Sequence, residues 1–418
     1  MRLTGRARRV HRPALAAALA VTVFGGPFAA TGVASAQAPA DSLAAQIQDG
    51  AAAAIESALG LPADGYGIDQ LARLYPSDLP ARGTYIALMD GFTQLRAERP
   101  DIIAKNLQTV VEINNSADAR TVARAIFDNY ENREISLADS LGEHLGAAFL
   151  SAYEGGRLPK VKALIGGYLS RSGGLINSSL IEKEVYDNPR PFVVDPAHIV
   201  RHDDERGTVH SSVETSGSYP SGHTSGAYLT ASLLATMVPE LAPQILTRAS
   251  EVGNSRIVLG VHYPLDVISG RMLGTAAAAD RLADPEFARL VDEAGDELRA
   301  VLERETGRPL TEVIADDTAY LPTDEATRVY RERMTYGFDR VGAPGVPIEV
   351  PAEAAALLRG VFPDLTDAQR LQVLAQTATD SGYPLDKSGP QGGWQRIDLA
   401  AASAAEVTVR PDGSVSVS

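Results

Sequence analysis

The sequence of 418 residues contains no cysteine. This absence excludes disulfide bonds, thiolate nucleophiles and metal sites built on cysteine. Positive charge is also scarce, because 38 lysines and arginines stand against 53 aspartates and glutamates, which gives a formal net charge of −15. A protein this acidic is not expected to hold nucleic acid through a broad basic surface.

Long apolar runs are missing beyond the N-terminal region. A membrane-spanning helix needs about 20 consecutive apolar residues. The best candidate after residue 36 runs from Tyr228 to Val238, which is too short, and it ends at Pro239. We therefore expect no integral membrane span once the N-terminal segment is removed.

Residues 1–36 have the pattern of a bacterial export signal. Arginines precede an apolar run from Pro13 to about Ala30, and an A-x-A cleavage pattern follows at 34–36. Removing this segment, which holds five arginines and no acid, leaves 382 residues (418 minus 36) and lowers the charge from −15 to −20. We expect a secreted, periplasmic or cell-envelope protein that is cleaved near Ala36.

Apolar residues recur at helical spacing from about Arg82 to Thr306. Strand-like alternation is scarce there, so we predict an all-α helical bundle for residues 82–307. The expected helical stretches are Thr84 to Ala97, Asp101 to Asn114, Ala119 to Asn129, Leu137 to Tyr153, Ser221 to Val238, Pro243 to Val252 and Pro264 to Leu282.

The segments on either side of this bundle differ from it in composition. Residues 37–81 begin Ala-rich and then contain Gly, Pro and Tyr, so we expect them to wrap the bundle without a core of their own. In residues 308–418, prolines and glycines interrupt short helical pieces, and residues 407–417 alternate around a Pro-Asp-Gly turn. We predict a mixed C-terminal extension of unknown role that ends in a hairpin.

Three short blocks carry the residues that indicate chemistry. They supply three cations, two imidazoles, a carboxylate and a glycine-containing helix start, a set that suits nucleophilic attack on a bound tetrahedral oxyanion. The blocks are Lys183 with Arg190-Pro191, then Pro220-Ser221-Gly222-His223, then Ser255-Arg256 followed by His262 and Asp266.

The second block is expected to begin a helix, because Ser218 can cap it and Pro220 fits its first turn. The amides of Ser221, Gly222 and His223 would then lack intrahelical partners and could bind an oxyanion. The absence of a Cβ at Gly222 would let that oxyanion approach the backbone closely.

The third block predicts another helix start, since Pro264 suits a first turn. His262 then lies just outside the helix, and Asp266 lies in the first turn, within reach of the imidazole. A carboxylate on one ring nitrogen fixes the tautomer and leaves the other nitrogen with a lone pair for nucleophilic attack.

The spacing of the blocks, K-x6-RP, PSGH and SR-x5-H-x3-D, resembles the signature of the type 2 phosphatidic acid phosphatase superfamily. The longer stretches GSYPSGHT (residues 217–224) and EVGNSRIVLGVHYPLDVISGR (residues 251–271) extend the likeness, which is closest to the bacterial class A non-specific acid phosphatases. The resemblance implies a helical bundle with its site at one end.

The resemblance also implies roles for individual residues. His262 would attack phosphorus to form a phosphohistidine, Asp266 would orient it, and His223 would protonate the leaving oxygen and later activate water. No metal or other cofactor is implied, although vanadate or phosphate can occupy such a site. The implied phosphate-binding residues are Lys183, Arg190, Ser221, Gly222 and Arg256.

We therefore expect a secreted, soluble phosphatase that hydrolyses small phosphate monoesters. Other functions stay open. Vanadium haloperoxidases resemble the same motif set and hold vanadate through the residue equivalent to His262, although residues 215–218 lack the aromatic or histidine that usually precedes their SGH turn. A lipid or isoprenoid phosphate phosphatase of the cell envelope, or a binding protein with an idle pocket, are further alternatives, and the sequence leaves the oligomeric state open.

A second cluster of possible metal ligands lies between the first and second blocks. Its order along the chain is irregular, so we interpret it as a charged, solvent-exposed loop, which could also form part of the pocket rim. Its members are His198, His202, Asp203, Asp204, Glu205 and His210.

Overall fold

The computed structural model describes residues 60–79, 85–130, 132–167, 170–173, 180–389 and 391–418. The predicted export signal, residues 1–36, and much of the 37–81 segment lie outside these residues. None of the helices in the described ranges is both long enough and apolar enough to cross a membrane.

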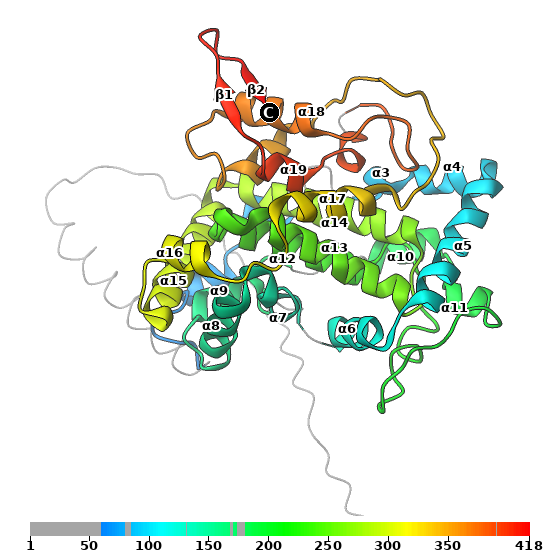
Figure 1. Ribbon diagram of the computed structural model, residues 1–418, viewed down its shortest axis with the longest axis horizontal. Coiled ribbons are helices and arrows are strands. Elements are labelled where there is room, and N and C mark those ends of the chain that lie inside the picture. Colours follow the sequence, from blue (N-terminus) through cyan, green and yellow to red (C-terminus); the bar gives the residue numbers. More distant parts are fainter. Residues whose placement is uncertain (1–59, 80–84, 131, 168–169, 174–179, 390) are drawn as a thin grey trace, which may run out of the picture. The chain divides into compact units, whose positions relative to one another are not determined.

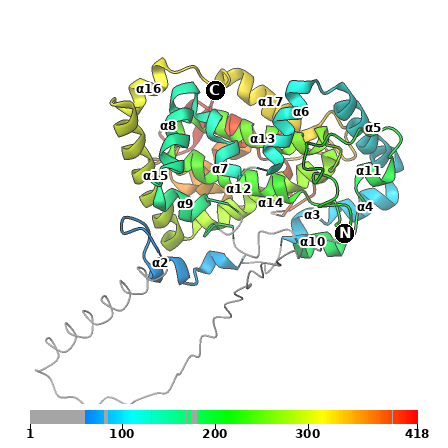
Figure 2. The ribbon, with the colours of Figure 1, turned by 90° about the horizontal axis from the view of Figure 1, so that it is seen from below.

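Three helices form the centre of the fold: α12 (Gly222–Met237), α13 (Ala242–Val258) and α14 (Pro264–Ala283). They pack against one another, and Figures 1 and 2 show α12, α13 and α14 side by side. Almost every side chain of α12 and α14 is buried. For α12 this matches the composition, because a helix that is apolar on most faces is stable only inside a core, whereas α14 also buries Asp266 and Arg271.

Two glycines of α14 allow α12 to approach closely. A Cβ at Gly270 would lie 2.7 Å from the carbonyl oxygen of Ser221, and one at Gly274 would lie 2.3 Å from that of Ser225. Both distances are too short for a side chain, so only glycine permits this contact. The first turns of α12 are therefore held against α14.

The remaining helices surround this centre. Among them, α5, α6 and α17 pack on α13, whereas α15 packs on α12 and also contacts α8 and α9. The elements before α12 are α2 (Ile68–Ala72), η1 (Pro76–Asp78), α3 (Ile86–Met89), α4 (Gly91–Glu98), α5 (Pro100–Ser116), α6 (Ala119–Tyr130), α7 (Arg133–Ser136), η2 (Ala138–Leu141), α8 (Glu143–Glu154), α9 (Pro159–Ile165), α10 (Leu180–Tyr186) and α11 (Pro191–Val194). The others are η4 (Pro239–Leu241), α15 (Pro285–Thr306), α16 (Leu310–Asp316) and α17 (Thr323–Thr335).

The C-terminal extension packs directly on the central helices. Its elements η5 (Ala352–Leu358) and η6 (Gly393–Gln395) contact α14, and α19 (Leu399–Ser403) contacts α13. The buried Arg271 of α14 donates to the carbonyl oxygens of Trp394, Gln395 and Ile397. The strands β1 (Val407–Val409) and β2 (Val415–Val417) pair antiparallel beside α18 (Asp367–Thr377).

The described residues are mostly helical, and the only strands among them are β1 and β2, so the predicted all-α class with a mixed extension is confirmed. The terminal hairpin is confirmed as well. The predicted single helix from Leu137 to Tyr153 is wrong, because Gly142 separates η2 from α8. Its φ of 107° lies in a region that favours glycine, and a Cβ there would meet the carboxylate of Asp317.

Candidate active site

The second motif begins α12, but later than predicted. The N-cap is Ser221, whose Oγ accepts from the amide of Thr224 at 3.3 Å, and Pro220 precedes the cap. The amide of Ser221 donates to the carbonyl oxygen of Asp266 at 3.0 Å, so the prediction that it is free for an oxyanion is wrong. The amides of Gly222 and His223 donate to no residue in the described ranges, and these two can bind an anion.

The third motif begins α14 as predicted. Pro264 is the first helical residue, Tyr263 is the N-cap, and His262 lies just before it. Oδ2 of Asp266 lies 3.1 Å from Nδ1 of His262 and accepts from the amide of Tyr263 at 2.9 Å. Both side chains of the histidine–aspartate pair are buried, so the carboxylate holds the imidazole in one orientation.

The other ring nitrogen of His262 faces a cation. Nε2 lies 3.2 Å from Nη1 of Arg190. If Nδ1 carries the proton shared with Asp266, Nε2 has a lone pair that accepts from the guanidinium. Burial lowers the pKa of His262 well below its usual value, and the charges of Arg190 and Lys183 lower it further. Both effects favour the neutral imidazole.

Arg190 is also tied to the loop that precedes α12. Its guanidinium donates to the carbonyl oxygens of Val213, Ser216 and Gly217, and to that of Val261 before α14. These bonds engage most of its donors. Arg190 thus holds the loop in place. It can bind an anion only if one of its N–H groups bonds both to the anion and to its present acceptor, or leaves that acceptor for the anion.

Lys183 holds the same loop. Its Nζ donates to the carbonyl oxygens of Gly217, Ser218 and Pro220 at 2.9, 3.3 and 3.0 Å. An ammonium has three donors, so all three have acceptors here. Burial lowers the pKa of Lys183, and the charge of Arg190 lowers it further.

Arg256 is buried with no carboxylate beside its guanidinium. Nη1 donates to Oδ1 of Asn129 at 2.6 Å, and no described residue accepts from Nε. Burial lowers the pKa of Arg256 to about 9, with contributions from Arg190 and Arg133. A charged guanidinium in such a place is stabilised when an anion binds.

His223 is partly buried in the first turn of α12. Its Nε2 lies 3.2 Å from the carbonyl oxygen of Asn129, the same residue whose side chain contacts Arg256. Burial lowers the pKa of His223 well below its usual value, and the charges of Arg256 and Arg133 add to this effect. A bound anion would oppose this lowering, because a nearby negative charge favours the protonated imidazole.

The structure brings the predicted residues together at the starts of α12 and α14. The buried side chains of Arg190, Arg256, His262 and Asp266 meet there, and His223 and His262 interact electrostatically. Sequence reasoning missed Asn129 and Arg133, which come from the end of α6 and the start of α7. Neither belongs to a local motif, and only the tertiary fold places them beside the site.

The histidine-rich loop does not gather its members around one point. His198 pairs with Asp195 at 2.8 Å, Nε2 of His202 lies 3.1 Å from the carbonyl oxygen of Asn114, and Nε2 of His210 lies 2.9 Å from that of Leu259. The described ranges hold no group of three or more His, Cys, Asp or Glu side chains arranged to bind a metal. The prediction of full solvent exposure is wrong for His210, which is buried against Phe192.

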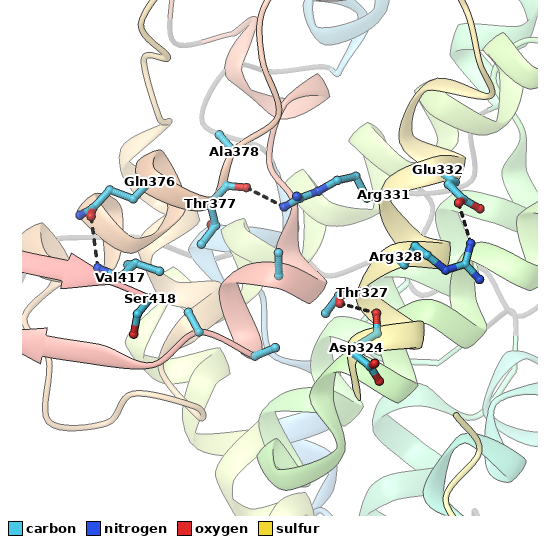
Figure 3. A pocket seen from close by; sticks show the side chains of 13 residues that line it. Asp324, Thr327, Arg328, Arg331, Glu332, Gln376, Thr377, Ala378, Val417 and Ser418 are labelled. Carbon is cyan, nitrogen blue, oxygen red and sulfur yellow. Dashed lines mark hydrogen bonds and ion pairs between the residues drawn. The ribbon is translucent and has the colours of Figure 1, made fainter. Parts of the chain in front are cut away.

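A cavity of about 600 Å³ lies elsewhere, between α17, the end of α18 and the C-terminal strand (Figure 3). Its arginines already have partners. Arg331 pairs with Asp398 at 2.6 Å and donates to the carbonyl oxygen of Thr377, while Arg328 pairs with Glu332. No residue of the three motifs lines this cavity, so we place the candidate active site at the motifs.

Comparison with known proteins finds similarity in the part of the chain that holds the motifs. Residues 162–283, which include all three motifs, match the model of the PAP2 superfamily. A non-specific acid phosphatase of Providencia stuartii is 32% identical over 139 residues, which cover 33% of this chain and 53% of the relative. One of Salmonella typhimurium is 34% identical over 116 residues, covering 28% and 44%, and an acid phosphatase of Zymomonas mobilis is 35% identical over 116 residues, covering 28% and 42%.

The matched part spans about half the length of these relatives or less. The residues that match the family model, 162–283, include the helix starts that carry both histidines. Residues 162–283 of this chain therefore match the PAP2 superfamily, which is the family that the three motifs resemble.

Proposed function

We propose that this protein hydrolyses phosphate monoesters through a phosphohistidine intermediate on His262. One observation carries the proposal. Nδ1 of His262 lies 3.1 Å from the carboxylate of Asp266, while Nε2 faces the guanidinium of Arg190 at 3.2 Å. A neutral imidazole nitrogen beside a cation suits attack on a phosphoryl group, provided that Arg190 transfers its hydrogen bond from Nε2 to a phosphoryl oxygen when substrate binds.

In the first step, the Nε2 lone pair of His262 forms a bond to phosphorus and the bond from phosphorus to the ester oxygen breaks. The leaving oxygen takes a proton from His223. Asp266 stabilises the positive charge that develops on the imidazole of His262, because its carboxylate is already bonded to Nδ1.

In the second step, water attacks phosphorus and the bond to Nε2 of His262 breaks. The water gives a proton to His223, which restores the starting protonation state. Phosphate leaves, and no oxidant, reductant or further co-reactant is needed.

The charge of the phosphoryl group would be balanced by side chains and by helix amides. Arg256 has donors without a described acceptor, Arg190 lies beside the attacking nitrogen, and the amides of Gly222 and His223 point out of the first turn of α12. The proposed scheme includes no metal ion, and we expect activity to persist in the presence of EDTA.

The substrates that we propose are small, water-soluble phosphate monoesters met outside the cytoplasm. The acidic chain argues against nucleic acid as a partner, and the first 36 residues have the pattern of an export signal. Export can be tested by fractionation of the producing cells and by N-terminal sequencing of the product, for which a start at Gln37 is expected.

Phosphate release from p-nitrophenyl phosphate, nucleotides and sugar phosphates tests the activity. His262→Ala should abolish turnover and labelling of the protein by radioactive phosphate. His144→Ala is a matched control, because His144 is exposed and also pairs through Nδ1 with a carboxylate, that of Asp317 at 2.8 Å. Full labelling of the His262→Ala variant would contradict the assignment of the nucleophile.

The same preparation separates the alternative functions. A vanadate haloperoxidase would oxidise halide when vanadate and peroxide are added, whereas we expect vanadate to act only as a competitive inhibitor of phosphate release. A preference for a lipid phosphate over the soluble monoesters would favour a lipid phosphatase of the cell envelope.

A further inference from the structure

Asn129 contacts both the proposed general acid and one of the proposed phosphate-binding arginines. Its side-chain oxygen accepts from Nη1 of Arg256 at 2.6 Å. Its main-chain carbonyl oxygen lies 3.2 Å from Nε2 of His223. A single residue at the end of α6 therefore touches two groups that the motifs place on α13 and α12.

The position of Asn129 is fixed by its neighbour. Asp128 is fully buried and accepts from Nη1 of Arg248 at 3.1 Å and from Oγ of Ser255 at 2.8 Å. Ser255 directly precedes Arg256 in α13. The end of α6 and the site end of α13 are thus joined by charged hydrogen bonds immediately beside Asn129.

The chemistry of the amide suits both contacts. An amide oxygen is a neutral acceptor, so it orients the guanidinium of Arg256 without cancelling its charge. A carbonyl acceptor at Nε2 of His223 requires a proton on that nitrogen. Nδ1 is then the ring nitrogen that exchanges a proton with the leaving oxygen.

We infer that Asn129 is a positioning residue that holds the guanidinium of Arg256 in the direction of the phosphate while keeping its charge uncompensated, and that fixes the orientation of His223. This inference rests on the proposed function. The inference extends that function by assigning a role to a residue outside the three motifs.

Charged groups from several elements face His223. Arg256 comes from α13, Arg133 from α7 and Lys183 from α10. Burial is the largest cause of the lowered pKa of His223, and the charges of these three residues lower it further. Asn129 adds the only hydrogen bond to this imidazole among the described residues, and it opposes that lowering. A negative charge at position 129 would therefore act on a group surrounded by cations.

Two substitutions separate the side-chain contact from the main-chain contact. Asn129→Ala removes the acceptor of Arg256 but keeps the carbonyl at His223. We expect KM and the inhibition constant of inorganic phosphate to rise on the order of tenfold, with no change in the pH profile, because one charged hydrogen bond is lost. Asn129 is only partly buried, so this change leaves no closed cavity.

Asn129→Asp replaces the neutral amide that contacts Arg256 with a carboxylate, in a residue whose main chain also contacts His223. We expect phosphate inhibition to weaken at least as much as in Asn129→Ala. An opposite charge favours protonated His223, so the pKa of the general acid rises and the alkaline limb of kcat/KM moves to higher pH. Asn115→Asp is the matched control, since it makes the same change on an exposed amide of α5 and should shift neither quantity.

The inference is overturned if both Asn129 variants, folded by circular dichroism, keep the phosphate inhibition constant and pH profile of Asn115→Asp. It is also overturned if they lower only kcat in proportion to a loss of melting temperature, which a purely structural role would produce. If the unmodified protein releases no phosphate from any monoester, the proposed function fails by itself. In that case, calorimetric measurement of inorganic phosphate binding still tests the role of Asn129. An unchanged affinity in Asn129→Asp would contradict the proposed contact with Arg256.

Discussion

Two buried arginines of α13, Arg248 and Arg256, lie eight residues apart and meet opposite surroundings. Arg248 contacts Asp128 through two nitrogens, and Asp139 and Glu251 lie within 3.2 and 3.4 Å of it. Among the described residues, the guanidinium of Arg256 donates a hydrogen bond only to the neutral side-chain oxygen of Asn129. Burial opposes the charge of both, but the carboxylates raise the pKa of Arg248, whereas the pKa of Arg256 is lowered.

The difference distinguishes a structural cation from one that requires a ligand. The middle of α13 forms a closed ion pair that joins α6 to the core. At the site end, no described carboxylate pairs with Arg256, and we proposed that a phosphoryl group does so. A buried guanidinium is costly without an anion, so this cost favours phosphate binding.

The largest effect is expected from Arg248→Met. It leaves the buried carboxylate of Asp128 without its partner, and the free energy of unfolding should fall by about 3 to 5 kcal/mol. Urea denaturation measures this change. Under conditions where the variant is folded, its kcat/KM should stay within a few-fold of that of the unmodified protein. A complete loss of activity in the folded variant would contradict the purely structural role of Arg248.

Arg256→Met should have the opposite effect, with a large loss of activity and little loss of stability. The variant removes a buried charge that has no carboxylate, so the melting temperature should stay unchanged or rise. Loss of a group that stabilises transition-state charge should lower kcat/KM by about 100- to 1000-fold. A large fall in stability with little change in kcat/KM would show that Arg256 is structural.

Inorganic phosphate should stabilise the protein through the site end only. At about 100 times its dissociation constant, a ligand that binds only the folded state adds about 2.7 kcal/mol. We expect phosphate to raise the melting temperature of the unmodified protein and to have no such effect on Arg256→Met. Sulfate at the same ionic strength indicates how much of the shift reflects a tetrahedral anion in general.

The smallest effect concerns Lys183 and pH. Burial lowers its pKa from the usual 10.5, so its charge is present below the lowered pKa and is lost as pH rises through it. Phosphate inhibition should therefore weaken on the alkaline side. Lys183→Arg keeps its charge and should move this limb up by about one pH unit or more, whereas Lys105→Arg on α5 should not move it.

The sequence predicted the local parts of the site well. Helix starts depend on prolines and caps that neighbour each other in the chain, so the pairing of His262 with Asp266 at the start of α14 followed from spacing alone. The general all-α fold followed from helical periodicity in the same way. These features are determined by residues within one or two turns of each other.

Contacts between distant segments could not be predicted. The amide of Ser221 bonds to the carbonyl of Asp266, and the donors of Lys183 bond to carbonyls of the loop before α12. Main-chain carbonyls have no sequence signature, because every residue carries one. Asn129 likewise follows no motif, and only the packing of α6 on α13 identifies it.

Arg271 donates to the backbone at Trp394, Gln395 and Ile397, so the end of the C-terminal extension is bonded directly to α14. Arg271 lies five residues after Asp266 in α14, so a protein that ends before Trp394 would leave a guanidinium without these acceptors in the helix that carries Asp266. Residues 394–418 would thus stabilise the helix that carries Asp266, and their proteolytic removal should abolish the proposed phosphatase activity although no motif residue is lost.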